Sequence, residues 1–342
     1  MSASGHKGLR ASAPYAGILL LGLAAAMLPQ FSPSGEVMSI ATTVVVWAIA
    51  ASGFGFLWGQ SGQLSLAHAA VFGLGAYTAA ICAKFWQLGF VAALPLSILV
   101  GMFAASLIVL PSLRTQGHYF VILTFAIGEV IAVFEKRLDG ITGGSNGILI
   151  SSAGQEFLGL RLSNRADFYV LAVGCATLVL LFLLLLMRSR WGTTLRGLRE
   201  NPDLAASLGV NVAVHRLLAF LVSGAIAGLG GQLYLYQVKF IAPMLFTSQA
   251  SIIFLLVVLL GGKTYLLGPT IGAFVYFFLS HFLGLPPIVN QMVFGAILVV
   301  MILLAPDGLP SIFRRLMRHR VSSPPTPPAA AAGPGAATAG GG

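Results

Sequence analysis

The sequence predicts an all-α polytopic membrane protein with about ten transmembrane helices. Of its 342 residues, 57% are hydrophobic and only 8% are charged, whereas soluble proteins carry about 25% charged residues. The apolar residues fall in long runs separated by short polar segments, and this composition excludes a soluble globular fold. The net charge of +10 would suit a nucleic-acid-binding protein, but the basic residues gather at the ends of the apolar runs.

Ten apolar runs are long enough, or nearly long enough, to cross a membrane as helices. The expected spans are residues 14–31, 37–58, 62–83, 89–111, 117–134, 166–187, 213–237, 246–263, 266–284 and 286–304. Glycine and proline interrupt the regions 62–83 and 246–284, so we expect a kinked or re-entrant segment there. The first run is short enough to be a cleaved signal peptide, but we interpret it as a retained span.

Two blocks of four closely spaced spans, residues 37–134 and 213–304, suggest an internal repeat. Each block contains a glycine-rich turn that opens an apolar helix, at residues 59–62 in the first and 261–262 in the second. Transporters commonly carry such repeats, with the pathway at their interface. Chance similarity among apolar segments is the alternative explanation.

The charge distribution predicts that both termini are cytoplasmic. An even number of spans places the termini on one side, and most lysines and arginines then fall on inner segments. These segments are the N-terminus (residues 1–13), the loop 188–212 and a tail, residues 311–342, which is basic and then Pro/Ala/Gly-rich and expected to be disordered. The one long outer loop, 135–165, is either flexible or a seat or lid for an external partner.

The longest polar stretch between spans, residues 188–209, is expected to be folded. Thr193 or Thr194 can cap a first short helix, and Asn201 followed by Pro202 begins a second one. An apolar stripe on a water-facing loop predicts a docking element for a partner, although a solvated loop that only orients the protein is the alternative. The residues assigned to this element are Arg196, Arg199, Glu200, Asn201, Pro202, Leu204, Ala205, Leu208 and Gly209.

Within that element, the apolar stripe is expected to matter most. Leu204, Ala205 and Leu208 should lie on one side of the second helix and be covered by the partner. Arg196 and Arg199 should matter less, because exposed ion pairs contribute only about 0–1 kcal/mol.

Polar residues at the start of the third span, and one acid in the fifth, are candidates for a solute path. Gln63, Ser65 and His68 fall at a depth where only protein or water can satisfy them. They either line the path or hydrogen-bond helices together, and the second role is favoured for His68. Glu129 is the one acid well inside an apolar run, which makes it a functional candidate. A proton-driven carrier would need more such groups.

Motifs for nucleotide binding, metal binding and catalysis are missing. Gly262-Lys263-Thr264 resembles the end of a phosphate-binding loop, but Val257 stands where the first glycine of that motif belongs. The two cysteines, Cys82 and Cys175, lie in apolar runs and indicate neither a disulfide framework nor a metal site. We therefore expect no catalytic residue, metal or cofactor on this chain, and any ATP must be used by another subunit.

Several segments together resemble the permeases of branched-chain amino-acid ABC transporters, most of all the larger, M-type member of the permease pair. The segments are residues 62–78, 117–120, 126–129, 142–144, 199–202, 205–209 and 219–231. The match covers roughly residues 37–310. The segments identify the family only when taken together, and no single one would do so. There are two mild departures. Family members usually read Gly-Gly-x-Gly-Thr before Gly-Pro, whereas this chain reads Gly261-Gly262-Lys263-Thr264-Tyr265 before Gly268-Pro269. Ala67 also stands where glycine is common.

This resemblance implies a transmembrane permease domain over residues 14–310 that imports leucine, isoleucine and valine. It implies a second permease subunit, two ATPase subunits that use ATP and magnesium, and a soluble periplasmic substrate-binding protein. It places the chain in the bacterial inner membrane, with the loop 188–212 docked on an ATPase. Relatives in this family take urea or short amides, so these solutes are alternatives. A self-sufficient secondary transporter, and an intramembrane enzyme using His68 or Glu129, are the other hypotheses.

Overall fold

The computed structural model describes residues 5–31, 34–112, 115, 117–151, 156–157, 160–284, 286–304 and 308. Helices dominate the described chain, which confirms the all-α prediction. Seven segments are long and apolar enough to cross a membrane by length and composition. They are Pro14–Phe31, Gly35–Ser61, Phe90–Pro111, His118–Arg137, Arg165–Arg188, Val212–Val238 and Pro243–Gly261.

The ten expected spans each correspond to a helix. These helices are α1 (Gly5–Ala26), α3 (Gly35–Ser61), α4 (His68–Phe85), α5 (Phe90–Ser112), α6 (His118–Arg137), α8 (Arg165–Arg188), α11 (Val212–Val238), α12 (Ser248–Gly261), α13 (Gly268–Leu283) and α14 (Pro287–Leu304). Three bounds differ by more than four residues. Helix α1 begins at Gly5, within the expected polar N-terminus, and ends at Ala26, five residues before the expected end. Helix α4 begins six residues later than expected.

Short elements connect the long helices. They are α2 (Leu28–Phe31), α7 (Asp139–Thr142), η1 (Gly144–Asn146), α9 (Arg190–Glu200), α10 (Pro202–Ser207), η2 (Pro243–Phe246), and the strands β1 (Ile148–Leu149), β2 (Glu156–Phe157), β3 (Leu160–Arg161) and β4 (Phe240–Ile241). Strand β1 pairs antiparallel with β4, and β2 with β3.

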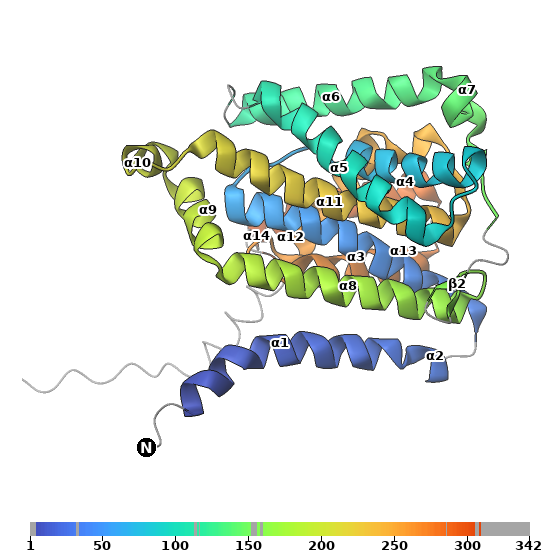
Figure 1. Cartoon of the computed structure of the whole chain (residues 1–342), viewed down its shortest axis with the longest axis horizontal. Helices are drawn as coiled ribbons and strands as arrows, with labels where there is room; N and C mark the ends of the chain where they lie inside the picture. The colour runs from blue at the N-terminus through green and yellow to red at the C-terminus, as the bar shows by residue number, and fades with distance from the viewer. Residues whose placement is uncertain are drawn as a thin grey trace, which may run out of the picture.

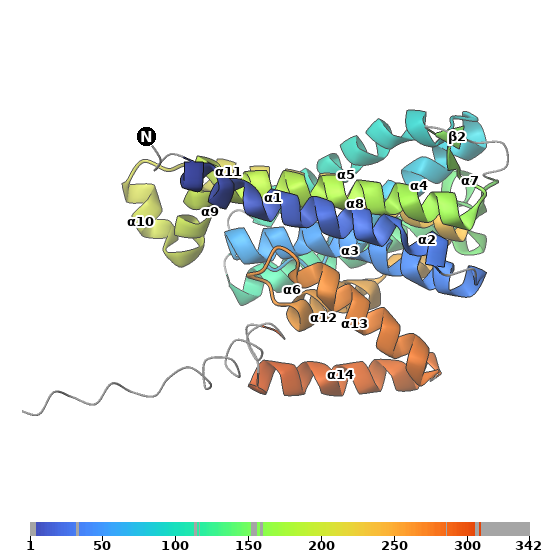
Figure 2. The same ribbon diagram turned by 90° about the horizontal axis from the view of Figure 1, so that it is seen from below.

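Helices α3 and α11 lie at the centre of the bundle, and α11 packs against α3, α4 and α5. In Figure 1, α8 and then α1 lie on one side of α3, while α5 and α6 lie on the other. Figure 2 shows α13 and α14 projecting from a third side. Helices α9 and α10 extend beyond one end of the long helices, and α7 lies at the opposite end.

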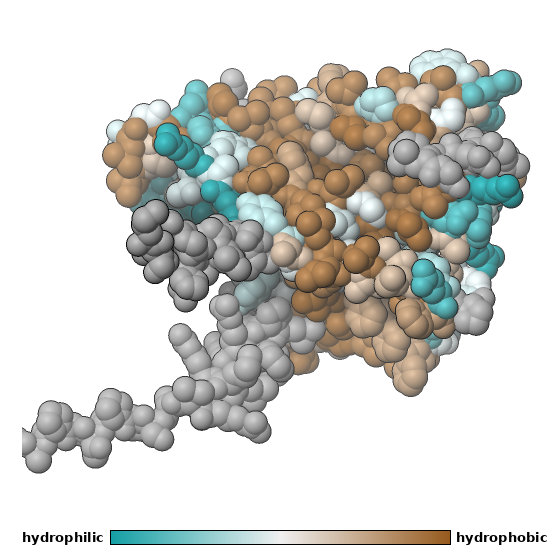
Figure 3. Space-filling model, turned by 60° about the horizontal axis from the view of Figure 1, so that its bottom comes forward, coloured by the Kyte–Doolittle hydropathy of each residue, from teal (hydrophilic) through white to brown (hydrophobic). Residues whose placement is uncertain are grey.

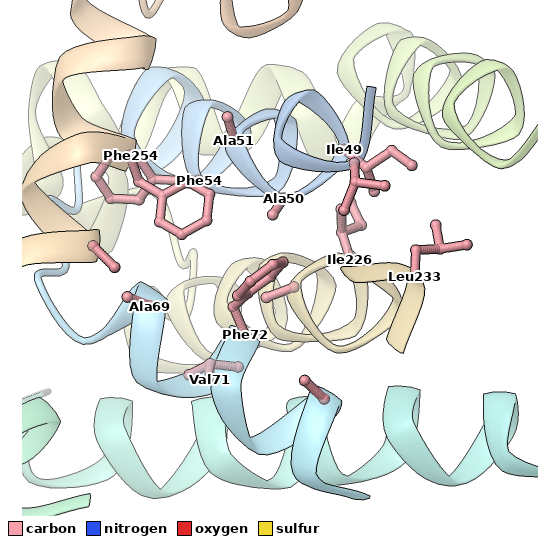
Figure 4. Packing of buried hydrophobic residues seen from close by; sticks show 14 of the residues in the cluster. Ile49, Ala50, Ala51, Phe54, Ala69, Val71, Phe72, Ile226, Leu233 and Phe254 are labelled. Carbon is pink, nitrogen blue, oxygen red and sulfur yellow. The ribbon is translucent and has the colours of Figure 1, made fainter. Parts of the chain in front are cut away.

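The core is rich in aromatic and small residues. Phe72 of α4 packs edge to face on Phe254 of α12, with ring centroids 5.5 Å apart, and Trp47 of α3 stacks on the same Phe254 ring at 4.7 Å. Figure 4 shows α3, α4, α11 and α12 around Phe72 and Phe254. On the face drawn in Figure 3, a broad apolar band separates polar groups at the two ends. This band is the surface expected of a protein surrounded by lipid.

The two expected interruptions occur at residues 62–67 and 262–267. Gly62, with φ 74°, ends α3, and Gly262, with φ 88°, ends α12. Helices α12 and α13 have 14 and 16 residues, fewer than the roughly 20 that a perpendicular crossing needs.

The two glycine-rich turns do not hold equivalent places in the two four-span blocks. One joins the first and second helices of its block, and the other joins the second and third. The turns pack directly together instead: a methyl group on Gly59 would overlap the Lys263 carbonyl oxygen. The glycines therefore permit close packing between the blocks rather than mark a shared repeat position.

Helix α1 lies along α8. Ile18 is buried against Leu180 and Leu184, and the Tyr169 hydroxyl donates to the Ala25 carbonyl oxygen at 3.1 Å. A methyl group on Gly22 would overlap the Thr177 hydroxyl. These contacts hold α1 against α8.

The described part of the expected outer loop is ordered rather than flexible. Helix α6 continues to Arg137, and tight turns follow in which Gly143, Gly144 and Gly147 all have positive φ. Ile148 of β1 is buried and pairs with Ile241 of β4, and a methyl group on Gly147 would overlap the Ile241 carbonyl oxygen. The expected disordered tail, residues 311–342, lies outside the described residues.

Candidate coupling and transport site

Ser189 begins helix α9, not Thr193 or Thr194 as expected. Its hydroxyl oxygen accepts from the Gly192 amide at 3.1 Å, while the two threonine hydroxyls donate to carbonyl oxygens one turn back. Ser189 also caps the C-terminus of α8. Ser189 alone therefore connects α8 to α9, which leaves the two helices little freedom to move relative to one another.

Asn201 begins α10 as the sequence predicts. Its side-chain oxygen accepts from the Leu204 amide at 2.9 Å, Pro202 occupies the first helical turn, and Gly209 follows with φ 85°. Asp203 lies in the first turn, where its charge complements the helix dipole.

The expected apolar stripe on α10 is divided in the structure. Ala205 is buried, whereas Leu204 and Leu208 are 58% and 77% exposed. Leu208 caps the C-terminus of α10, four residues after Leu204, and both leucine side chains turn away from the protein. Helix α9 buries its own leucines, Leu195 and Leu198. Helix α9 thus anchors the loop, and α10 presents two leucines with no covering group in the described chain.

Arg199 ties this loop to the end of α3. Its guanidinium donates to the Gly59 carbonyl oxygen, and a methyl group on Gly62 would lie 2.8 Å from Arg199 Cγ. The last carbonyls of a helix have no partner within it and carry partial negative charge, so a guanidinium is a favourable partner. Both arginines are exposed, but Arg196 donates to the Thr193 hydroxyl of its own helix at 3.3 Å and does not reach α3 in the described chain.

Because of this contact, Arg199→Gln should impair transport several-fold more than Arg196→Gln, whereas the sequence alone did not distinguish the two arginines. A hydrogen bond to a charged group contributes about 1.5–3 kcal/mol, and the Arg199 bond joins α9 to α3 whereas the Arg196 bond stays within α9. The measurement is the ratio of solute moved to ATP hydrolysed by the assembled transporter. Equal ratios for the two variants would contradict the proposed link from α9 to α3.

Gln63 and Ser65 lie in the non-helical connection 62–67, not inside a helix as expected, because Gly62 ends α3 and α4 begins only at His68. Ser65 is buried and Gln63 is half-buried. Thr124 of α6 accepts from the Leu66 amide at 3.1 Å, which fixes the connection against α6. Both candidate path residues therefore lie on the segment whose first residue contacts Arg199.

His68 and Glu129 lie near this connection. The His68 Nε2 atom lies 3.0 Å from the Ala50 carbonyl oxygen of α3, and the ring is buried between Phe54 and Phe254, each with its centroid 5.2 Å away. Such contacts suit a histidine that joins helices. Glu129 is half-buried on α6, next to Gly128, which packs against Ala67.

A family model described as the permease component of the branched-chain amino acid transport system matches residues 37–302. The chain belongs to this permease family. It is 30% identical to the high-affinity branched-chain amino acid transport system permease protein LivM of Escherichia coli, over 85% of this chain and 73% of the relative. It is also 30% identical to LivM of Salmonella typhimurium, over 82% and 71% of the two chains. A probable LivM of Methanocaldococcus jannaschii is 27% identical over 64% and 67%. No solved structure matches.

Membership of this permease family agrees with the resemblance seen in the sequence and makes an enzyme an unlikely assignment. The Gly262-Lys263-Thr264 run lies in the tight turn between α12 and α13, where the Lys263 ammonium lies 4.8 Å from the centre of the Trp58 ring. Within the described ranges, no group of three or more His, Cys, Asp or Glu could hold a metal ion.

Glu135 is a residue that sequence reasoning missed. It precedes Lys136 and Arg137, so it resembles one of the charges that flank the end of a membrane helix. In the structure it is only 3% exposed. One signal could have found it: the buried face of α6 recurs at residues 120, 124, 128 and 132, and Glu135 continues that face.

Proposed function

We propose that this chain is the membrane-spanning permease subunit of an ATP-binding-cassette importer of branched-chain amino acids. The observation that carries the proposal is the permease-family match over residues 37–302, together with similarity to LivM over 85% of the chain. The solute path runs through the helical bundle, and the chain itself performs no chemical reaction.

The proposed partners are a second permease subunit, two ATPase subunits and an external substrate-binding protein. The projecting helix α10 supports the ATPase assignment, because Leu204 and Leu208 form an exposed apolar face at the end of the bundle. Arg199 would carry a displacement of α9 to the end of α3 and to the connection 62–67. A rigid movement of packed helices is one established way to convert such docking into opening or closing of a path.

The proposed location is the bacterial inner membrane, with α9 and α10 in the cytoplasm. Arginines at positions 188, 190, 196 and 199 support this orientation. The end that carries α7 and the β1–β4 pair would then face the external binding protein.

The purified chain alone should bind no nucleotide and should move no solute on a proton gradient. No intact phosphate-binding motif is present in the sequence, and intramembrane acids are few. Nucleotide binding is measured by equilibrium titration, and uptake with proteoliposomes under an imposed gradient. Gradient-driven uptake by this chain alone would favour a secondary transporter.

The decisive test of the substrate is uptake of labelled leucine, urea and short amides by the complete transporter reconstituted with its binding protein. Leucine uptake that requires both ATP and the binding protein is the expected result. Uptake of urea or an amide in place of leucine would reassign the substrate within the same family.

A further inference from the structure

A large apolar cavity lies between α4, α5 and α6. Its volume is about 560 Å³, within the range of small-molecule binding sites. Aliphatic side chains form most of its wall, among them Ile81, Ile108 and Leu138. The lining extends to the end of α6 that adjoins α7, and exposed side chains such as Leu107 and Phe134 belong to its rim.

Two polar side chains in this wall lack partners in the described chain. Neither carboxylate oxygen of Glu135 has a hydrogen-bond partner, and neither does the hydroxyl of Tyr77, although all three atoms are buried. The backbone around Glu135 is held in place, because the Thr142 hydroxyl donates to the Glu135 carbonyl oxygen at 2.6 Å. The backbone at Glu135 is thus fixed by the turn after α6, while its carboxylate has no hydrogen-bond partner in the described chain.

A buried carboxylate without a partner is costly, and a paired cation removes much of that cost. No lysine or arginine is among the described residues that line the cavity. An ammonium group of a bound solute would supply the missing positive charge through charge-assisted hydrogen bonds. The hydroxyl of Tyr77 could donate to an anionic group on the same solute.

We propose that this cavity is a substrate site on the outer part of the import path. Glu135 would hold the α-ammonium of an aliphatic amino acid, Tyr77 would donate to its α-carboxylate, and the aliphatic wall would contact the branched side chain. The proposal rests on the proposed function, which supplies a zwitterionic aliphatic solute. It also distinguishes that solute from urea and short amides, because these lack an ammonium group.

The first test compares Glu135→Gln with Glu36→Gln in the complete transporter reconstituted with its binding protein. Both changes replace a carboxylate by an amide, but the Glu36 side chain is 77% exposed at the start of α3. Leucine uptake by Glu135→Gln should fall by at least about tenfold, because charge-assisted hydrogen bonds are lost. Leucine uptake by Glu36→Gln should be unchanged. Tyr77→Phe should reduce uptake by a smaller factor.

The second test measures occupancy directly and does not depend on the Glu135 variant assembling. In the full complex with Cys82→Ala and Cys175→Ala, leucine should protect Ile81→Cys from a maleimide. 4-Methylpentanoate, which has the same branched chain and carboxylate without the ammonium, should not protect it. Adding Glu135→Gln should remove the protection by leucine.

The possible outcomes distinguish failure of the cavity assignment from failure of the proposed function. Leucine import by the unmodified complex, with full uptake by Glu135→Gln, would overturn the cavity assignment and leave the importer intact. Equal protection by leucine and 4-methylpentanoate would also overturn it, because binding would then not use the ammonium. No protection by leucine would overturn it too and would indicate a cavity filled by lipid or by the second permease subunit. Failure of the unmodified complex to import leucine would instead reject the proposed function.

Discussion

Replacing both exposed leucines of α10, Leu204→Asp with Leu208→Asp, should abolish ATPase co-purification and solute uptake while leaving the chain inserted in the membrane. Each leucine side chain buried in a complex contributes about 1.5–3 kcal/mol, and each 1.4 kcal/mol is about tenfold in affinity. Losing two such contacts, and burying two charges in their place, should weaken docking by at least two orders of magnitude. Both leucines face away from the bundle, so the fold should survive.

Ala206→Asp provides the matched control for this prediction. Ala206 is exposed on the same helix, two residues from each leucine, and therefore lies on the opposite side of α10. It adds a carboxylate to the same helix without removing a leucine, so ATPase binding should change little. Pull-down from membranes and ATP-dependent uptake measure the two properties. If the double variant kept both, the loop would act only as an orientation signal.

The boundaries of most spans could be predicted because apolar runs end where lipid contact ends. The start of α4 could not, since the sequence remains apolar and small from residue 64 onward, across the connection and into the helix. Gly62, with φ 74°, was the local sign of the break, but its packing against Arg199 of the distant helix α9 is not visible in a local pattern. Hydropathy alone cannot separate a buried connection from a helix.

The second helix of the loop shows the same limit at the level of single side chains. The Asn201-Pro202 start depends on local geometry and was predicted correctly. The division between Ala205 and the two leucines depends on how α10 packs against its neighbours, which a periodic pattern does not specify. Glu135 was missed for a related reason: its burial depends on α4 and α5, distant in sequence.

The close packing of α11 predicts the largest effect on stability. Gly224 and Gly228 are four residues apart and face α5, where a methyl group on Gly228 would overlap the Ser97 carbonyl oxygen and one on Gly224 would lie 2.5 Å from the Ala105 side chain. Small residues at this spacing allow membrane helices to approach until their backbones touch. Backbone atoms cannot move aside as a flexible side chain can.

Gly228→Val should therefore greatly reduce the amount of folded protein and its thermal stability in detergent. Overpacking a core costs about 1–3 kcal/mol or more, a large part of a total stability of about 5–15 kcal/mol. Gly174→Val in α8 is the matched control, because nothing lies within 4 Å of the position its first side-chain carbon would take. The midpoint of thermal unfolding and the recovery of monodisperse protein should fall for Gly228→Val and remain near wild type for Gly174→Val. Equal shifts for the two variants would mean that α11 and α5 are not held in backbone contact at Gly228.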